Sequence, residues 1–86
     1  MSEERIGTIT QYSGNRQVAV VKIESGTLSV GDTIHVNGHT SDFTQKVDSM
    51  QIEHESVETA TAGQSVGLKV IEHARAHDEV SRVLPD

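Results

Sequence analysis

Apolar and polar residues alternate along much of this chain, and a period of two is typical of half-buried β-strands. The clearest case is the segment 17–24, in which three apolar side chains share one face: Ala19, Val21 and Ile23. Val18 and Val20 fall on the other face with Lys22, so that face must also be partly covered. The segment is therefore predicted to form a strand with one buried face and one half-covered face.

Five further short strands are predicted from the same kind of pattern, at residues 5–12, 33–36, 43–53, 64–71 and 79–84. Ile6 and Ile9 would lie on opposite faces of a regular strand, so Gly7 is expected to mark a bulge or a close approach of two backbones. Short strands separated by frequent turn signals predict an all-β fold. We expect a small closed or nearly closed antiparallel β-barrel, because closure removes exposed strand edges.

Three segments do not fit a regular strand. The apolar residues of the segment 43–53 change phase half-way, which predicts a bulge near Asp48 and Ser49. The segment 55–63 is too short and too weakly patterned to call a helix, although one helical turn is compatible with it. The segment 72–78 is charged and is expected to form a loop.

Glycine residues mark two predicted turns. The segment 30–32 indicates a tight turn around Gly31, and Asn37-Gly38 is the strongest short signal for a β-hairpin. Glycine tolerates positive φ, which a type I′ turn requires at both central positions. We therefore predict a two-residue type I′ turn at Asn37-Gly38 and expect His35, in the strand before it, at the surface.

Length and composition narrow the fold further. The chain has 86 residues, which suits one domain, and residues 1–86 are expected to form a single unit. Apolar residues make up 34% and aromatic residues 2%, which suits a barrel filled by Val and Ile better than a helical bundle. Cysteine is absent, which excludes disulfides and thiolate metal sites within this sequence.

The net charge of −6 gives no overall basic surface for a nucleic-acid backbone. The Lys and Arg residues are scattered, although a local patch of Arg16 with Lys22 or Lys46 could still touch RNA. No apolar run approaches the ~18 residues of a membrane span, and the charged start of the chain lacks the apolar core of a signal peptide. A cytoplasmic protein with no membrane partner is therefore expected.

The sequence offers few groups for catalysis. It has no Cys nucleophile, no serine in a G-x-S-x-G nucleophile elbow, and no G-x-x-x-x-G-K-S/T phosphate loop. Glu53 and Glu55 share a face of a predicted strand, where they could cooperate in acid–base catalysis or form a solvated edge. We predict no nucleotide binding, no GTP hydrolysis and no enzymatic activity of this chain alone.

Five histidines raise the question of a metal site. His73 and His77 have the i, i+4 spacing that binds zinc when both residues lie on a helix. Their predicted place in a loop removes that geometry, so we expect no metal and no other cofactor. A further alternative is a metal-dependent enzyme that uses His54, His73 and His77 with Glu53.

Three motifs resemble those of domain 2 of the translation GTPases, the β-barrel beside the nucleotide domain in elongation factor Tu. The segment 26–34 is similar to the family's G-x-x-x-V-G-D-x-I signature, the segment 62–68 to its A-G-x-x-V-G-L turn and strand, and the segment 77–80 to its G-D-x-V block. His77 stands where the family usually has Gly, so that turn must be built differently. The segment 50–55 resembles small stand-alone translation elongation factor-like proteins.

The resemblance spans residues 5–84 and implies partners as well as a fold. In elongation factor Tu the domain helps to hold the aminoacyl end of tRNA, and the corresponding positions fall near Thr8 and Gln51. The implied ligand face consists of six residues: Thr8, Tyr12, Gln51, Glu53, His54 and Ser65. Tyr12 would either stack on a base or fill the rim of the core. The implied partners are tRNA or the ribosome, together with a larger protein.

Two functions remain open at this point. The first is a non-catalytic binding module, related to the elongation factor β-barrel, that docks on RNA, on a protein partner, or on both. The alternative is an accessory subunit of an RNA-modifying or peptidase-like enzyme, which contacts the substrate and performs no chemistry. Stable association with a larger enzyme would distinguish the second function from the first.

Overall fold

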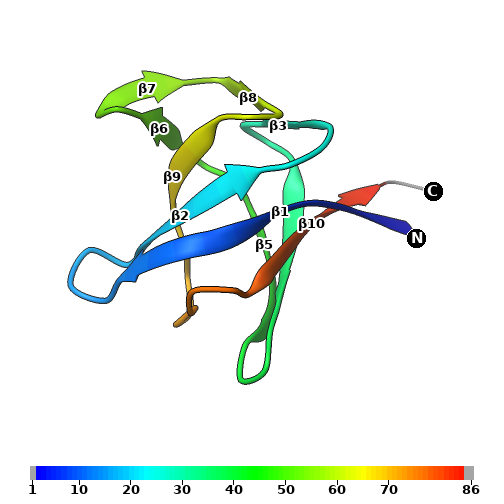
Figure 1. Cartoon of the computed structure of the whole chain (residues 1–86), viewed down its shortest axis with the longest axis vertical. Helices are drawn as coiled ribbons and strands as arrows, with labels where there is room; N and C mark the ends of the chain where they lie inside the picture. The colour runs from blue at the N-terminus through cyan, green and yellow to red at the C-terminus, as the bar shows by residue number, and fades with distance from the viewer. Residues whose placement is uncertain (1, 85–86) are drawn as a thin grey trace.

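Ten β-strands make up the computed structural model, which describes residues 2–84 and contains no helix over that range (Figure 1). Their bounds are β1 (Ser2–Ser13), β2 (Val18–Ile23), β3 (Thr27–Ser29), β4 (Thr33–Asn37), β5 (Asp42–Lys46), β6 (Met50–Ile52), β7 (Glu55–Val57), β8 (Thr59–Thr61), β9 (Ser65–Lys69) and β10 (Glu79–Leu84). The predicted all-β class is confirmed. Over the same residues, no helix is long and apolar enough to cross a membrane.

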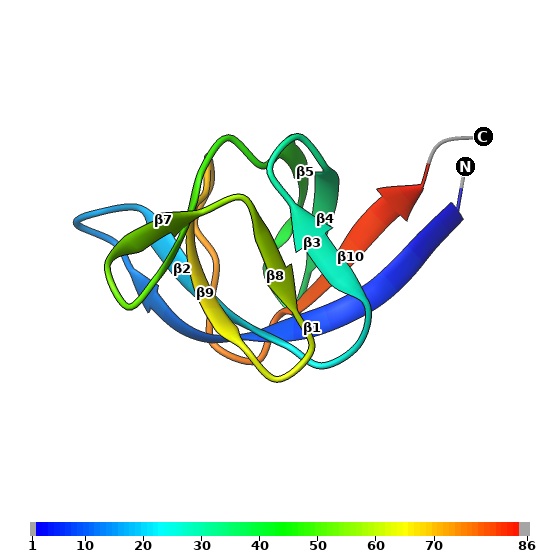
Figure 2. The same ribbon diagram turned by 90° about the horizontal axis from the view of Figure 1, so that it is seen from above.

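Eight of the strands form one antiparallel sheet in the order β5-β4-β10-β1-β2-β9-β6-β7, while β3 pairs with β8 in a separate sheet. The larger sheet curls around the core, as seen from above in Figure 2. Its order begins at β5 and ends at β7, so strand pairing does not close it. Closure into a barrel is therefore not confirmed, whereas the antiparallel all-β arrangement is.

Single backbone hydrogen bonds replace a continuous ladder near the open end of the sheet. The Gly31 N–H donates to the Val47 carbonyl oxygen at 2.9 Å, and the Val47 N–H donates to the Asp32 carbonyl oxygen at 2.8 Å. The Val30 N–H donates to the Glu58 carbonyl oxygen at 2.9 Å. The β3–β4 turn thus connects the segment after β5 with the segment before β8.

A buried side chain makes a further connection from β5. The amide nitrogen of Gln45 donates to the Lys69 carbonyl oxygen at 2.8 Å, and its amide oxygen accepts from the Ile71 N–H at 2.7 Å. Gln45 is only 9% exposed, so water has little access to these groups. The side chain of Gln45 therefore joins the edge strand β5 to the end of β9, which is not its neighbour in the sheet.

The core consists mainly of branched aliphatic side chains, with Phe43 as its only buried aromatic residue in the described chain. Its buried apolar members are Ile6, Ile9, Ala19, Val21, Ile23, Leu28, Ile34, Val36, Phe43, Val47, Met50, Ala60, Val66, Leu68, Val70, Ala74 and Val80. The predicted inward face of β2 is fully buried, and Val18 and Val20 on its other face are half-buried. Both expectations for this strand are confirmed.

The two predictions for Gly7 are also confirmed. The pairing of β1 with β10 shifts register between Arg5 and Gly7, and this irregularity allows both Ile6 and Ile9 to be buried. A Cβ atom on Gly7 would collide with the backbone carbonyl of Lys22 on β2. The glycine is therefore needed because two backbones approach closely at this point.

The assignments for residues 43–63 need two corrections. The phase change near Asp48 and Ser49 is real, but it marks a break between β5 and β6 rather than a bulge in one strand. The segment 55–63 forms strands β7 and β8 instead of a helical turn. Strands of three residues point only one or two side chains inward, such as Ala60 in β8, so no period of two is visible in the sequence.

The turns differ in how well the sequence predicted them. Gly31 has φ of 98°, as the tight turn requires. Neither Asn37 nor Gly38 has positive φ, so the predicted type I′ turn is wrong. A four-residue loop connects β4 to β5 instead, and its Gly38 N–H donates to the Ser41 carbonyl oxygen at 2.7 Å. Glycine is needed at 38 because the buried Asp78 carboxylate occupies the space of a Cβ atom.

The last turn and the chain ends complete the fold. His77 has φ of 78°, so the histidine adopts the left-handed conformation usual for Gly, and the expectation of a differently built turn is wrong. β1 pairs with β10 from Ser2↔Leu84 to Thr8↔Glu79. The two ends of the described chain therefore lie side by side (Figure 1).

Candidate functional site

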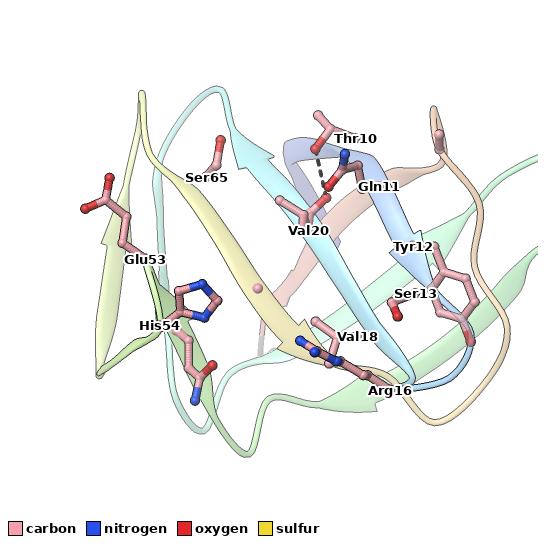
Figure 3. Close-up of a pocket in the computed structure, with 13 residues that line it drawn as sticks. Thr10, Gln11, Tyr12, Ser13, Arg16, Val18, Val20, Glu53, His54 and Ser65 are labelled. Carbon is pink, nitrogen blue, oxygen red and sulfur yellow. Dashed lines mark hydrogen bonds between the residues drawn. The ribbon is translucent and has the colours of Figure 1, made fainter.

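A groove of about 800 Å³ lies on the outer side of the sheet, across β1, β2, β9 and β6 (Figure 3). Its lining comes from the end of β1, the β1–β2 turn, the outer face of β2 and β9, and the β6–β7 hairpin. The lining residues are Thr10, Gln11, Tyr12, Ser13, Arg16, Val18, Val20, Gln51, Glu53, His54, Ser65, Gly67 and Ala76. Segments far apart in the sequence thus form one concave surface.

The floor of the groove is apolar. Val18 and Val20 project outward from β2 and remain half-buried, and Gly67 lies directly beside Val20 in the neighbouring strand β9. A Cβ atom on Gly67 would be 3.6 Å from the nearest Val18 carbon, which is an ordinary contact distance. Since Gly67 has no side chain, the space above the floor stays open.

One wall of the groove is the turn between β6 and β7. Ile52 pairs with Glu55, so the hairpin has a two-residue turn made of Glu53 and His54. Both residues have positive φ, 51° and 67°, which is the backbone pattern of a type I′ turn. In Figure 3 the His54 imidazole is directed toward β9, whereas the Glu53 carboxylate points away from the imidazole.

The opposite end of the groove carries Arg16, which lies in the turn between β1 and β2. Figure 3 shows its guanidinium group beside Val18, directed toward the wall that bears His54. Arg16 is exposed and forms no ion pair with any residue in the range 2–84. It is also the only Lys or Arg among the lining residues, so the groove offers one available cation above an apolar floor.

The family model of elongation factor Tu domain 2 matches residues 16–71, which include the floor, the Arg16 end and the hairpin wall. This chain belongs to the elongation factor Tu domain 2 family. The resemblance inferred from the three sequence motifs is thus confirmed for the domain.

Two curated relatives of this domain 2 chain are named as proteases. A collagenase of Porphyromonas gingivalis is 37% identical over 78 residues, which are 90% of this chain and 22% of the relative. An uncharacterized protease of Methanocaldococcus jannaschii is 40% identical over 77 residues, which are 87% of this chain and 18% of the relative. The chain thus spans about a fifth of the length of these relatives, and their names differ from the stand-alone elongation factor-like proteins suggested by the sequence.

Solved structures share the fold of this domain 2 chain. The C-terminal domain of a putative U32 peptidase from Geobacillus thermoleovorans superposes with a TM-score of 0.87 and 20% identity, covering 94% of this chain and 93% of that domain. Its selenomethionine variant gives a TM-score of 0.84 at 21% identity, with coverage of 90% and 96%. The match extends over both chains almost completely, so the compared domain has the same extent as this one.

The structure brings together five of the six residues of the ligand face implied for this domain 2 chain. Tyr12, Gln51, Glu53, His54 and Ser65 all line the groove. Whether these residues bind a ligand stays a prediction, but their proximity is a property of the fold. The sequence reasoning did not include Val18, Val20, Gly67 or Arg16 in this face; the half-covered outer side of the second strand was the signal that could have found the floor.

Thr8, the sixth residue, lies outside the groove. The pairing of β1 with β2 shifts register between Ile9 and Gln11, so the residues before and after this irregularity face different surroundings. The Thr8 hydroxyl accepts a hydrogen bond from Arg5 at 2.7 Å and lies 3.4 Å from a Glu24 carboxylate oxygen. Thr8 therefore belongs to a polar network next to β10 and does not line the groove.

Tyr12 fills the rim of the core rather than presenting a free ring. It is half-buried and packs against the core cluster. Its ring meets that of His73 edge-on, with centroids 4.7 Å apart and an interplanar angle of 66°. Of the two roles considered for Tyr12, packing at the rim agrees with this position.

The predicted chemistry of the acidic and histidine residues changes in the folded chain. Glu53 lies in the hairpin turn and Glu55 begins β7, so they do not share a strand face as predicted. His73 packs on Tyr12, while His54 lies on the hairpin wall. Within residues 2–84, no three His, Asp or Glu side chains are grouped so as to hold a metal ion.

His35 is less exposed than predicted. Its imidazole is 21% exposed and lies between two carboxylates, with Nδ1 2.9 Å from a Glu3 oxygen and Nε2 2.5 Å from an Asp42 oxygen. The hydrogen bond with Asp42 and then that with Glu3 raise the pKa of His35 above 6.5. This cluster joins β1, β4 and β5 and lies outside the groove.

Proposed function

We propose that this chain is a non-catalytic accessory module of a peptidase-like enzyme, which contacts a polypeptide substrate through the groove. The observation that supports this function is the match with curated proteases over about nine-tenths of this chain and only about a fifth of theirs. A segment of that relative size suits a module that assists a catalytic part located elsewhere. This function develops the alternative named in the sequence analysis.

The groove residues support a binding role rather than a catalytic one. The chain contains no cysteine, and within residues 2–84 no hydrogen bond joins His54 to a serine or a carboxylate. A general base must lie within hydrogen-bond reach of the proton that it abstracts, usually with a second group to orient it. The groove instead combines apolar area with a few polar groups, which is typical of binding sites.

A second candidate function is docking on RNA, either on tRNA or on the ribosome, as a translation factor-like module in the cytoplasm. Membership of the elongation factor Tu domain 2 family favours it. Charge opposes it, because the chain carries −6 overall and the groove contains a single Arg or Lys. Nucleic-acid affinity normally depends on several cations that neutralise phosphates. We therefore rank RNA docking second, and we expect useful RNA affinity only together with a protein partner.

A titration of the isotope-labelled 86-residue protein followed by NMR tests both functions. One arm adds peptides prepared from heat-denatured collagen, and the other adds tRNA acceptor-stem RNA at physiological salt. We expect the peptides to shift the amide signals of the groove residues and to remain intact by mass spectrometry. Groove shifts with RNA at submicromolar concentration would favour the second function. Absence of groove shifts with the peptides would contradict the first function, and peptide cleavage would contradict a non-catalytic role.

A further inference from the structure

Backbone strain in this molecule is concentrated around the groove. Four non-glycine residues in the described chain have positive φ: Gln17, Glu53, His54 and His77. Glu53 and His54 line the groove, Gln17 lies between Arg16 and Val18, and His77 follows Ala76. The positive-φ positions farther away are glycines, at 26, 31 and 63. The turns that border the groove thus have non-glycine residues at positions where glycine would adopt positive φ without steric strain.

This strain indicates that the side chains of the hairpin wall are used. A non-glycine residue in the left-handed region costs about 1–2 kcal/mol. Such residues cluster at ligand sites, where the rest of the structure holds them in place. Glu53 and His54 form the whole two-residue turn, a position at which Asn-Gly would avoid most of the cost. Glu53 and His54 therefore place a carboxylate and an imidazole on this wall even though their backbone conformation lowers the stability of the fold.

The groove matches a ligand with one negative charge next to an apolar group. Arg16 supplies a guanidinium group that has no ion-pair partner within residues 2–84. A guanidinium group binds a carboxylate well, because two of its N–H groups can donate in parallel to the two carboxylate oxygens. Val18 and Val20 lie beside it and provide the apolar surface. A polyanion is disfavoured, because Glu53 lies on the opposite wall and the molecule as a whole is acidic.

We propose that this groove binds the C-terminal residue of a peptide, with the α-carboxylate on Arg16 and an apolar side chain on Val18 and Val20. The space above Gly67 accommodates that side chain. His54 on the opposite wall directs its imidazole toward β9, where it can hydrogen-bond to peptide groups, and Gln51 of β6 also lines the groove. The inference rests on the proposed function and narrows its substrate class from polypeptides in general to free carboxyl ends.

Three peptides test this inference on the 86-residue protein. The first is acetyl-Gly-Gly-Gly-Leu with a free carboxylate, the second is the same peptide as its C-terminal amide, and the third is acetyl-Gly-Gly-Leu-Gly-Gly-amide. Dissociation constants are measured from NMR shifts of groove amides. We expect the free acid to bind at least about tenfold more tightly than either amide, because only the acid can form the charge-assisted pair with Arg16.

Two substitutions assign the contacts. Arg16→Gln should weaken the free acid about tenfold and leave the amide unchanged. Lys46→Gln is the matched control, because it removes one exposed cation from β5, away from the groove. Gly67→Leu should abolish binding of the free acid by filling the floor, and the outward-facing Thr44→Leu on β5 is its control. Thermal melting of each variant verifies that the fold is retained.

The outcomes separate this inference from the broader function. Equal affinity for the free acid and the two amides would overturn recognition of the carboxyl end, while peptide binding by the module would still stand. Equal loss of affinity in Arg16→Gln and Lys46→Gln would overturn the role of Arg16. Absence of groove shifts with all three peptides up to about 10 mM, together with shifts caused by acceptor-stem RNA, would overturn both the inference and the peptide-binding function.

Discussion

Gly38 illustrates how one residue can be required for a reason that its sequence context conceals. Asn-Gly usually signals positive φ, yet the backbone at this position has no need of it. The need arises from Asp78, whose buried carboxylate also accepts a hydrogen bond from the Arg75 N–H at 2.9 Å. Space for this carboxylate, rather than the shape of the turn, accounts for the glycine.

Gly38→Val should therefore destabilise the protein by about 1–3 kcal/mol, because the new side chain would overlap with the Asp78 carboxylate. Urea unfolding followed by circular dichroism measures the change. Gly14→Val is a suitable control, since a Cβ atom at position 14 meets only the edge of the Tyr12 ring at 3.8 Å. Similar stability of the two variants would contradict the importance of this contact.

His35 gives stability a dependence on pH. Its pKa in the folded state is raised by the hydrogen bonds with Asp42 and Glu3, so its contribution is fully present below the unfolded value of about 6.5 and is lost as pH rises through the folded value. His35→Gln should therefore cost more stability at pH 5.5 than at pH 8.5. Asp42→Asn, which removes the main cause of the shift, should reduce the difference. If His35→Gln cost the same stability at both pH values, the contacts of His35 with Glu3 and Asp42 would not contribute to the pH dependence of stability.

The residue scale also shows where sequence reasoning fails. Positive φ was predicted at Asn37-Gly38, but a type I′ backbone occurs at Glu53-His54, which carry no turn signal of their own. A turn propensity describes the backbone conformation that a residue adopts at the lowest free-energy cost. The strands on either side of Glu53-His54 instead fix these two residues in a conformation of higher cost. Strained positions near a binding site are therefore the ones that local patterns cannot reveal.

At the scale of elements, strands of five or more residues were predictable, whereas three of the four strands of three residues were not. β2, β4 and β9 alternate over enough positions to define both faces. β3, β7 and β8 contain three residues each, and their identity depends on tertiary partners rather than on a repeated pattern. The open sheet could not be predicted either, because the pattern of apolar residues does not show whether the two edge strands pair with each other.

Gln45 is the side chain through which element β5 contacts the end of β9. Gln45→Leu keeps a similar volume but leaves the Lys69 carbonyl and the Ile71 N–H without their partner, which should cost about 1–3 kcal/mol. Thr44→Leu, on the exposed face of the same strand, is the control. Hydrogen exchange of the Ile71 amide should also accelerate in Gln45→Leu. Unchanged exchange would mean that this contact is not maintained in solution.

At the scale of the whole molecule, the groove determines which chemistry is available. The described chain has no phosphate-binding loop, and its groove contains one cation, which is insufficient to hold a triphosphate. We expect no GTP or ATP hydrolysis, as measured by phosphate release from protein of verified purity. Turnover that persists through further purification and disappears in Arg16→Gln would contradict a non-catalytic groove.

The pairing of Ser2 with Leu84 determines how this molecule would respond to a pulling force on its two ends. The two ends of the described chain leave one end of the β1–β10 ladder together, so a force that pulls them apart would load its hydrogen bonds one after another. This is the geometry of a zipper, and it opens at lower force than a ladder pulled along its length, in which all bonds share the load. Tension applied through these ends would first separate residues 2–8 of β1 from β10, before it reached residues 10–13 of β1, which line the groove.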